Sequence, residues 1–225
     1  VHDGAYVLEV SGDAMKTTYD TDDFKGDIII ENGTFDIQAG NDGIQSEHRL
    51  SLYDGNYKIQ TGGGSVNGVT AENAFEKGGF GRWNEASSNA LQSEDTPSAK
   101  GIKSGSDMVL YGGIYDMDTS DDSFHSNANL TIKGGNFTVA SGDDGFHSDA
   151  VLTLADGSVD VIKSYEGLEG SDVIIHGGYL LVKASDDGIN AAGGSDGDNA
   201  SQPSPDHFMD SDHVIEIHGG AIQVD

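Results

Sequence analysis

The sequence predicts an all-β fold in which residues 1–225 form a single domain, wound as a parallel β-helix (a solenoid) of about 22 residues per turn. Three observations support this prediction: a recurring acidic stretch, short alternating strands after glycine turns, and the lack of any sustained helical period. The acidic stretch is fullest as Ser-Gly-Asp-Asp-Gly-Phe-His-Ser at residues 141–148. Self-similarity at a short fixed period is typical of repeat architectures, in which each turn packs on its neighbours. The central position of the stretch is held by Gly101, Ser123, Gly145, Gly167 and Gly188, at intervals of 22, 22, 22 and 21 residues.

The first strand of each turn follows a glycine dipeptide that stands ten residues before the acidic stretch. Gly, Asp and Asn tolerate the positive φ that a tight turn between strands requires. Apolar residues then stand two and four positions further on, which is the period-two alternation of a strand with one buried face. These positions hold Tyr6, Phe35, Tyr57, Tyr115, Phe137, Val159, Leu180 and Ile222, followed by Leu8, Ile37, Ile59, Met117, Val139, Val161, Val182 and Val224.

Two further strands complete each turn. A short apolar segment precedes the glycines at residues 28–30, 50–52, 108–110, 130–132, 151–154, 173–175 and 214–217. A third inward column runs through Met15, Ile44, Ile102, Phe124, Phe146, Leu168 and Ile189. Three short strands in each period favour a parallel β-helix, in which every strand stacks on its copy about 4.8 Å away. A β-propeller blade needs roughly twice this period, and alternating helices are excluded because no window keeps a period of 3.6.

Three insertions interrupt the regular turns. A small acidic one covers residues 17–25, and two long loops cover 63–98 and 193–211. The first long loop holds Trp83, the only tryptophan. All three insertions depart from the repeated turns near the acidic stretch, so we expect them on one side of the molecule. Solenoids frequently bind their ligands on the side that carries such loops.

The net charge of -28 restricts the partners of the chain. Such acidity makes nucleic acid and anionic membrane surfaces improbable partners. No apolar run in the sequence is long enough to insert into a membrane, and the sequence shows no signal peptide. Because it contains no cysteine, disulfides and thiolate metal sites are excluded. Because the residues after Val1 already read as the middle of a turn, we expect the chain to be part of a longer precursor with its targeting segment upstream.

The stacked acidic residues predict Ca²⁺ as a cofactor. Carboxylates repeated about every 4.8 Å repel one another unless a cation lies between them, and one Ca²⁺ bridges oxygen ligands from adjacent turns. All-oxygen ligands favour Ca²⁺ over transition metals. The alternative is that each Asp caps its own turn by a local hydrogen bond to the backbone. The candidate metal ligands are Asp42, Asp121, Asp122, Asp143, Asp144, Glu166, Glu169, Asp186 and Asp187.

Two pairs of histidines stack in the same alignment, His125 with His147 and His176 with His218. The pattern around them lacks the ligand spacing of a closed zinc site, so we expect solvated surface histidines. The first pair lies two residues past the acidic turn, which also makes it a candidate for contact with a ligand bound there.

The combined motifs resemble a known family. They are the repeated Asp-Gly-Ile/Phe-x-Ser turns, the Gly-Gly-x-Phe/Tyr strands and the segment Ser-Ala-Lys-Gly-Ile-Lys at residues 98–103, after a Gly-rich loop. Over nearly the whole chain this pattern is similar to the carbohydrate-binding β-helix proteins of cellulolytic clostridia, described as polysaccharide-lyase-like. The resemblance implies a right-handed β-helix that binds Ca²⁺, is exported to the cell surface or the medium, and binds cellulose and acidic plant polysaccharides such as polygalacturonate.

We therefore expect a non-catalytic, monomeric protein that recognises plant cell-wall polysaccharide with the help of Ca²⁺. An acidic protein can bind an acidic polysaccharide if Ca²⁺ bridges the two sets of carboxylates, whereas a neutral glucan is bound through aromatic faces. The candidate sugar contacts are Trp83, His125, His147 and Tyr165.

The alternative is a Ca²⁺-dependent pectate lyase. β-Elimination needs a basic side chain near the metal, and Lys100 and Lys103 are the candidates because Lys100 stands within the acidic column itself. The same position equally favours a purely structural role in which Lys100 neutralises the neighbouring aspartates. A third alternative is a surface scaffold in which Ca²⁺ only stabilises the fold.

Overall fold

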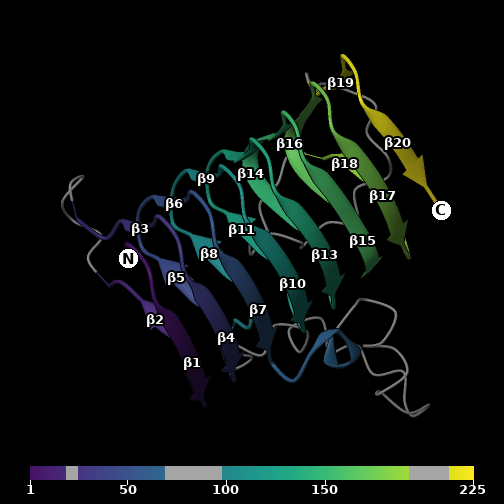
Figure 1. Ribbon diagram of the computed structural model, residues 1–225. Coiled ribbons are helices and arrows are strands. Elements are labelled where there is room, and N and C mark those ends of the chain that lie inside the picture. The colour runs from purple at the N-terminus through teal and green to yellow at the C-terminus, as the bar shows by residue number, and fades with distance from the viewer. Residues whose placement is uncertain (19–24, 69–97, 193–212) are drawn as a thin grey trace, which may run out of the picture.

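The chain folds into parallel β-sheets, and the all-β class is confirmed. A computed structural model describes residues 1–18, 25–68, 98–192 and 213–225. Its strands form an eight-stranded sheet and a twelve-stranded sheet, and every pairing between strands is parallel in the described residues. The N-terminal strands lie at one end of the stack and β20 lies at the other (Figure 1).

The eight-stranded sheet contains the strands predicted after each glycine turn. Their side chains alternate between the interior and solvent, as at β4, where Phe35, Ile37 and Ala39 are buried. The register aligns Tyr6, Phe35 and Tyr57, so equivalent residues of successive periods are direct neighbours. In order, the strands are β1 (Ala5–Val10), β4 (Thr34–Ala39), β7 (Asn56–Thr61), β10 (Ile114–Thr119), β13 (Asn136–Ser141), β15 (Ser158–Ser164), β17 (Tyr179–Ala184) and β20 (Ala221–Val224).

The twelve-stranded sheet combines the other two predicted strand columns. One column consists of β2 (Met15–Lys16), β5 (Ile44–Ser46), β8 (Ile102–Ser104), β11 (Phe124–Ser126) and β18 (Ile189–Ala191). The other consists of β3 (Ile28–Ile30), β6 (Leu50–Leu52), β9 (Met108–Leu110), β12 (Leu130–Ile132) and β19 (Ile215–Ile217). Two long strands, β14 (Phe146–Leu154) and β16 (Leu168–Ile175), pair with both columns and join them.

The core is built from stacked identical positions. Tyr57 and Tyr115 stack with ring centroids 4.7 Å apart, and Phe124 and Phe146 do so at 4.7 Å. The buried tyrosine hydroxyls still find partners, because Tyr115 donates to the carbonyl of Gly112 at 2.8 Å. Offset aromatic stacks add to the apolar area that each ring buries. The aromatic stacking thus stabilises the fold from Tyr6 to Phe146, and aliphatic residues take over the same positions beyond them.

Buried hydroxyl groups complete the corner after the second strand column. Ser104 Oγ donates to the carbonyl oxygens of His48 at 2.8 Å and Asp107 at 3.1 Å. Ser126 makes the same pair of bonds one period later, to Ser106 at 2.7 Å and Asn129 at 3.0 Å. The serine three residues past the central position of these two acidic stretches therefore satisfies buried backbone carbonyls, which would otherwise cost free energy.

The glycine turns adopt the predicted backbone conformation. Gly113 and Gly135 have φ values of 106° and 111°, a region that residues with a Cβ rarely adopt. A Cβ at Gly135 would also lie 3.0 Å from the carbonyl oxygen of Gly113.

The expected insertions fall largely outside the described residues. Of the segment 63–98, the structure describes residues 63–68, which contain a short 3₁₀ helix, η1 (Ser65–Asn67), and residue 98. Most of the loops 17–25 and 193–211, together with Trp83, lies outside the described part of the chain. Three strand pairings within it show register shifts. The pairing of β13 with β15 shifts between Val139 and Ala140, which leaves Ile162 as an extra, bulged residue, and the pairing of β15 with β17 shifts beside it. The third shift is in the pairing of β14 with β16, between Ser148 and Val151.

Candidate functional site

The predicted acidic column exists, and three of its carboxylates, those of Asp42, Asp122 and Asp144, cap the following period. Oδ1 of Asp122 accepts the backbone N–H of Asp144 at 3.0 Å, and Oδ1 of Asp144 accepts that of Glu166 at 3.1 Å. Asp42 caps Lys100 in the same way at 2.8 Å. Capping therefore runs from one period to the next rather than within one turn. It uses one carboxylate oxygen and leaves the other available for a cation or a side chain.

Lys100 stands in this column and pairs with the aspartates of the next period. Its Nζ lies 2.8 Å from Asp121 Oδ1 and 2.6 Å from Asp122 Oδ2. Burial alone would lower the pKa of Lys100, but the charges of Asp122 and Asp121 hold it well above its usual value. A buried, permanently protonated amine neutralises the column and is poorly suited to act as a general base.

The second lysine proposed for a lyase, Lys103, lies in β8 and is half-buried. The strand register places it between Gln45 of β5 and His125 of β11. Neither lysine thus gives the lyase alternative structural support.

Two groups of carboxylates could hold a cation. In the first, oxygens of Asp121, Asp122 and Asp143 lie within 4.8 Å of one another. Lys100 already supplies a positive charge to two of these three. Asp42, also predicted as a ligand, lies two periods before Asp122 and accepts a hydrogen bond from Ser98 Oγ at 2.8 Å.

The second group brings together Glu166, Asp186 and Asp187, again within 4.8 Å. Burial raises the pKa of Glu166 to about 7, because the acid is held among other carboxylates away from water. Asn190 Nδ2 donates to both Glu166 oxygens at 2.9 Å, which fixes the orientation of this carboxylate. Asp186 and Asp187 are exposed, so a cation from solvent can reach the group. An all-oxygen set of this kind suits Ca²⁺.

The expectation that His125 and His147 are solvated is wrong. Their rings stack at 4.6 Å inside the molecule, and the two residues are only 5% and 1% exposed. They pack there because β11 and β14 pair in register and carry inward Phe124 and Phe146 beside them. Carboxylates also converge on the two rings, contrary to the expectation from spacing alone. His176 and His218 are exposed and stacked at 5.0 Å, as expected.

Asp144 and Glu169, predicted as calcium ligands, instead face His147. His147 Nδ1 lies 2.8 Å from Glu169 Oε2 and 3.3 Å from Asp144 Oδ2. Burial, the charge of Asp122 and a hydrogen bond with Glu169 raise the pKa of Asp144 to about 9. By contrast, Lys100 and His125 hold the pKa of Asp122 far below its usual value, although burial opposes this. Identical residues in one column therefore differ in charge.

A pocket of about 370 Å³ opens beside Tyr165, at the bulge in β15. Lys163 and Lys183 line it, together with Ser164. The hydroxyl of Ser164 is buried and has no hydrogen-bond partner among the described residues. Bulges often re-aim side chains at binding sites, and an unsatisfied buried hydroxyl is costly unless a ligand or water reaches it. We call this the Tyr165 pocket. Its other lining residues are Ser65, Val66, Gly68, Ser141, Gly142, Ile162, Ala184 and Ser185.

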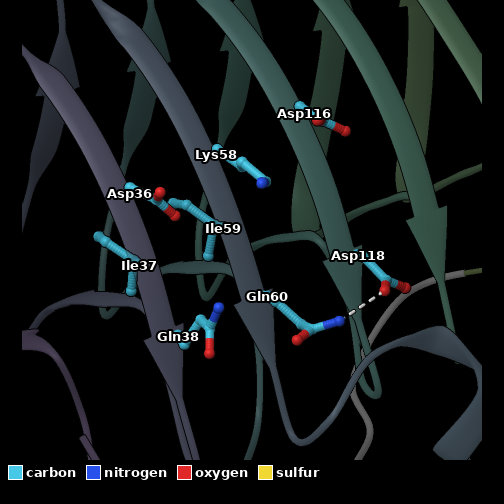
Figure 2. Close-up of a pocket in the computed structure, with 8 residues that line it drawn as sticks. All are labelled: Asp36, Ile37, Gln38, Lys58, Ile59, Gln60, Asp116 and Asp118. Atoms are coloured by element: carbon cyan, nitrogen blue, oxygen red, sulfur yellow. Dashed lines mark hydrogen bonds between the residues drawn. The ribbon is translucent and has the colours of Figure 1, made fainter. Parts of the chain in front are cut away.

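A second hollow, of about 300 Å³, lies across the outer face of β4, β7 and β10. Figure 2 shows its polar side chains in two rows, one with Asp36, Lys58 and Asp116 and one with Gln38, Gln60 and Asp118. Gln60 Nε2 donates to Asp118 Oδ2 at 2.9 Å, the bond drawn in the figure. We call this the sheet groove. It has amide, carboxylate and ammonium groups but no aromatic ring.

Sequence reasoning found the carboxylates and Tyr165 but missed Lys163, Lys183 and Ser164. These three residues come together through the bulge, and the spacing of the glycines on either side of it is unchanged. One feature of the sequence could have indicated a departure from the repeat here: Ser164 stands where the preceding period has Gly142.

Comparison with known proteins gives one match. A family model described as carbohydrate-binding domain-containing protein matches residues 1–145, which include the whole sheet groove and the column as far as Asp144. No curated protein and no solved structure is significantly similar to the chain. Within the described residues, no helix has the length and apolar character needed to cross a membrane.

Proposed function

The chain belongs to the family of carbohydrate-binding domain-containing proteins, whose model matches more than half of it, and we propose that it is a non-catalytic, calcium-dependent receptor for plant cell-wall polysaccharide. The observation that carries this proposal is the Tyr165 pocket beside the carboxylates of Glu166, Asp186 and Asp187. An aromatic ring, two lysines and a cation site adjoin one another there.

The composition of the pocket suits an acidic sugar such as polygalacturonate. A tyrosine ring packs against the apolar face of a pyranose, and lysine ammonium groups pair with uronate carboxylates. The unsatisfied hydroxyl of Ser164 can accept or donate a bond to a sugar hydroxyl. The positive charge of Lys163 and Lys183 offsets locally the strongly negative charge of the chain.

Calcium supplies the remaining attraction. Glu166, Asp186 and Asp187 provide hard oxygen ligands, and a Ca²⁺ held there can complete its coordination shell with a uronate carboxylate. Without the ion, the same three groups repel an anionic polymer. Binding to polygalacturonate should therefore depend on Ca²⁺.

The sheet groove favours a second ligand, a neutral glucan such as cellulose, bound through hydrogen bonds to its hydroxyl groups rather than through the aromatic faces expected from the sequence. Its rows of Asp, Gln and Lys side chains recur at the spacing of the strands and can bond successive sugar hydroxyls. All eight lining residues lie in the region that matches the family.

We further propose that the parallel sheets form a right-handed β-helix of about 22 residues per turn, and that the protein acts as a monomer outside the cell or at its surface. The strand registers, in which equivalent positions pair one period apart, support the β-helix. The extracellular location follows from the ligand, because cell-wall polysaccharides lie outside cells.

Co-sedimentation with the polymer tests the proposal. Wild-type protein should pellet with polygalacturonate in the presence of Ca²⁺ and remain soluble with a chelator. Tyr165→Ala and the double variant Lys163→Ala/Lys183→Ala should each weaken binding by about tenfold or more. Tyr53→Ala is the matched control, since this exposed tyrosine lies outside the pocket and its ring is stacked on Tyr111. The same series on cellulose, with Gln38→Ala/Lys58→Ala added, assigns the neutral ligand to the sheet groove.

Binding that persists with a chelator would remove calcium from the proposal. Equal loss in Tyr165→Ala and Tyr53→Ala would show that the pocket is not the site. A steady rise in ultraviolet absorbance from unsaturated uronide ends, abolished by chelator, would make the protein a lyase instead.

A further inference from the structure

His147 has a carboxylate oxygen within hydrogen-bond distance of each of its ring nitrogens. Its Nε2 lies 3.2 Å from Asp149 Oδ1, and its Nδ1 lies 2.8 Å from Glu169 Oε2. A neutral ring has one N–H and one lone pair, so one nitrogen would point its lone pair at a carboxylate. Three arrangements satisfy both nitrogens: both carry protons, a protonated carboxyl donates to the lone pair, or one nitrogen binds a cation that the carboxylates share.

The stacked ring makes the double protonation costly. His125 lies 4.6 Å away in a parallel stack, and its own Nδ1 is 2.8 Å from Asp122 Oδ2 while its Nε2 is 3.0 Å from Asn127 Oδ1. Two imidazolium rings stacked face to face and almost fully buried repel each other. A metal ion bound to one ring takes the place of a proton on that ring, so the two stacked rings need not both be imidazolium.

We propose that Asp144, His147 and Glu169 form a buried site for a divalent transition metal of the Zn²⁺ class, separate from the calcium group. Ligand atoms of these three residues lie within 4.8 Å of one another. Two of them come from one period and Glu169 from the next, because the register pairs His147 with Glu169. The site therefore links β14 to β16 across the ladder.

The ligand set selects the metal. Imidazole nitrogen suits Zn²⁺ and its first-row neighbours, whereas Ca²⁺ takes oxygen ligands. One histidine and two carboxylates match the three protein ligands of a tetrahedral zinc site with a fourth position left for water. Metal-bound histidines usually donate their other N–H to a carboxylate, which is the position that Asp149 occupies beside Nε2.

Without metal, protons occupy the same place. A hydrogen bond joins Asp144 to Glu169, so one carboxyl proton is shared between two groups that would otherwise repel. Zn²⁺ would displace this shared carboxyl proton. Metal binding should thus release protons and raise the stability of the fold.

The full-length chain, freed of metal by chelation, tests the proposal with Zn²⁺ in calorimetry and Co²⁺ in visible spectroscopy. We expect one Zn²⁺ per chain at this site, an upward shift of Tm, and a Co²⁺ spectrum that a large excess of Ca²⁺ does not abolish. Glu169→Gln keeps the size of the side chain and should weaken Zn²⁺ binding by at least about tenfold, and His147→Gln should abolish it. His176→Ala/His218→Ala removes the exposed histidine pair and serves as the control.

The results separate the possibilities. Unchanged Zn²⁺ affinity in a folded Glu169→Gln variant, or no binding to the wild type, would overturn the proposal. Loss of the Co²⁺ spectrum in the His176→Ala/His218→Ala control would assign the metal to the surface pair instead. If His147→Gln does not fold, the Glu169→Gln result alone decides.

Discussion

Replacing Lys100 by methionine removes the one ammonium group in the acidic column and keeps most of the side-chain volume. In the wild type, Lys100 Nζ makes charged hydrogen bonds of 2.8 Å to Asp121 and 2.6 Å to Asp122. Asp122 is 1% exposed and Lys100 is 7% exposed, so water cannot replace the lost partner. The variant therefore leaves the buried Oδ2 of Asp122 with the ring nitrogen Nδ1 of His125, 2.8 Å away, as its remaining side-chain partner.

The size of the effect follows from the unpaired charge. Removing one partner of a buried ion pair costs about 3–5 kcal/mol in free energy of unfolding. For a chain of 225 residues this corresponds to a fall in Tm of roughly 6–20 °C, at about 2–4 °C per kcal/mol. Lys103→Met, at a half-buried lysine in β8, should cost less than about 1 kcal/mol.

Urea unfolding followed by circular dichroism, with chelator present, measures these differences. The double variant Lys100→Met/Asp122→Asn should recover much of the loss, since the asparagine oxygen can still cap the N–H of Asp144 while the unpaired charge is gone. The pH dependence gives a second test. The folded-state pKa of Asp122 lies below its unfolded value, so its stabilisation is present above about pH 4 and is lost as the pH falls further. Lys100→Met should reduce this acid sensitivity.

A cost below about 1 kcal/mol for Lys100→Met would refute the structural role of Lys100. So would a double variant that is no more stable than the single one, because the penalty would then not come from an unpaired Asp122.

Three further predictions concern single positions. Gly105→Ala should lower the free energy of unfolding by about 1–3 kcal/mol in urea unfolding, because its Cβ would lie 2.2 Å from the backbone oxygen of Glu47. Gly12→Ala is the control: its Cβ would have nothing within 4 Å, so the unfolding free energy should change by less than about 0.5 kcal/mol. Ser148→Ala should cost about 1 kcal/mol in urea unfolding through the loss of one buried 2.6 Å hydrogen bond, and a neutral result would contradict the role given to the serine column. The pKa of Glu166 is about 7 in the folded, metal-free protein, above the ordinary 4.5, so protons compete with Ca²⁺ below that pH. Ca²⁺ affinity by calorimetry should fall about 30-fold from about pH 8 to about pH 5.5, and a Glu166→Gln variant should lose this dependence.

The strand columns could be predicted from the sequence because every position repeats. Met15, Ile44 and Ile102 were aligned by counting residues, and the structure pairs them in that register. A shift of one residue would turn each of these side chains to the opposite face, so the apolar columns determine the alignment. The acidic column followed from the same count. The chemistry of the column could not be predicted from the count, because counting residues does not show which carboxylate oxygen accepts a backbone N–H.

The interior histidines and the Tyr165 pocket could not be predicted in this way. A histidine two residues past the acidic turn reads as polar, yet His147 and its strand neighbours Phe146 and Ser148 are all buried. The bulge at Ile162 depends on how β15 fits between β13 and β17, and it leaves the glycine spacing unchanged. Both features arise from packing between periods rather than from any local pattern.

Stacking identical positions also explains why one column needs different cations along its length. Successive periods lie about 4.8 Å apart, so a carboxylate at every step meets a like charge above and below it. The ammonium group of Lys100 relieves this repulsion for Asp121 and Asp122. From Asp144 onward the column holds no lysine among the described residues, and the pKa values of Asp144 and Glu166 are both raised. In that half of the molecule the charge has to be balanced by protons or by bound metal, so the half of the column without lysine is where ligand-dependent stability should be found.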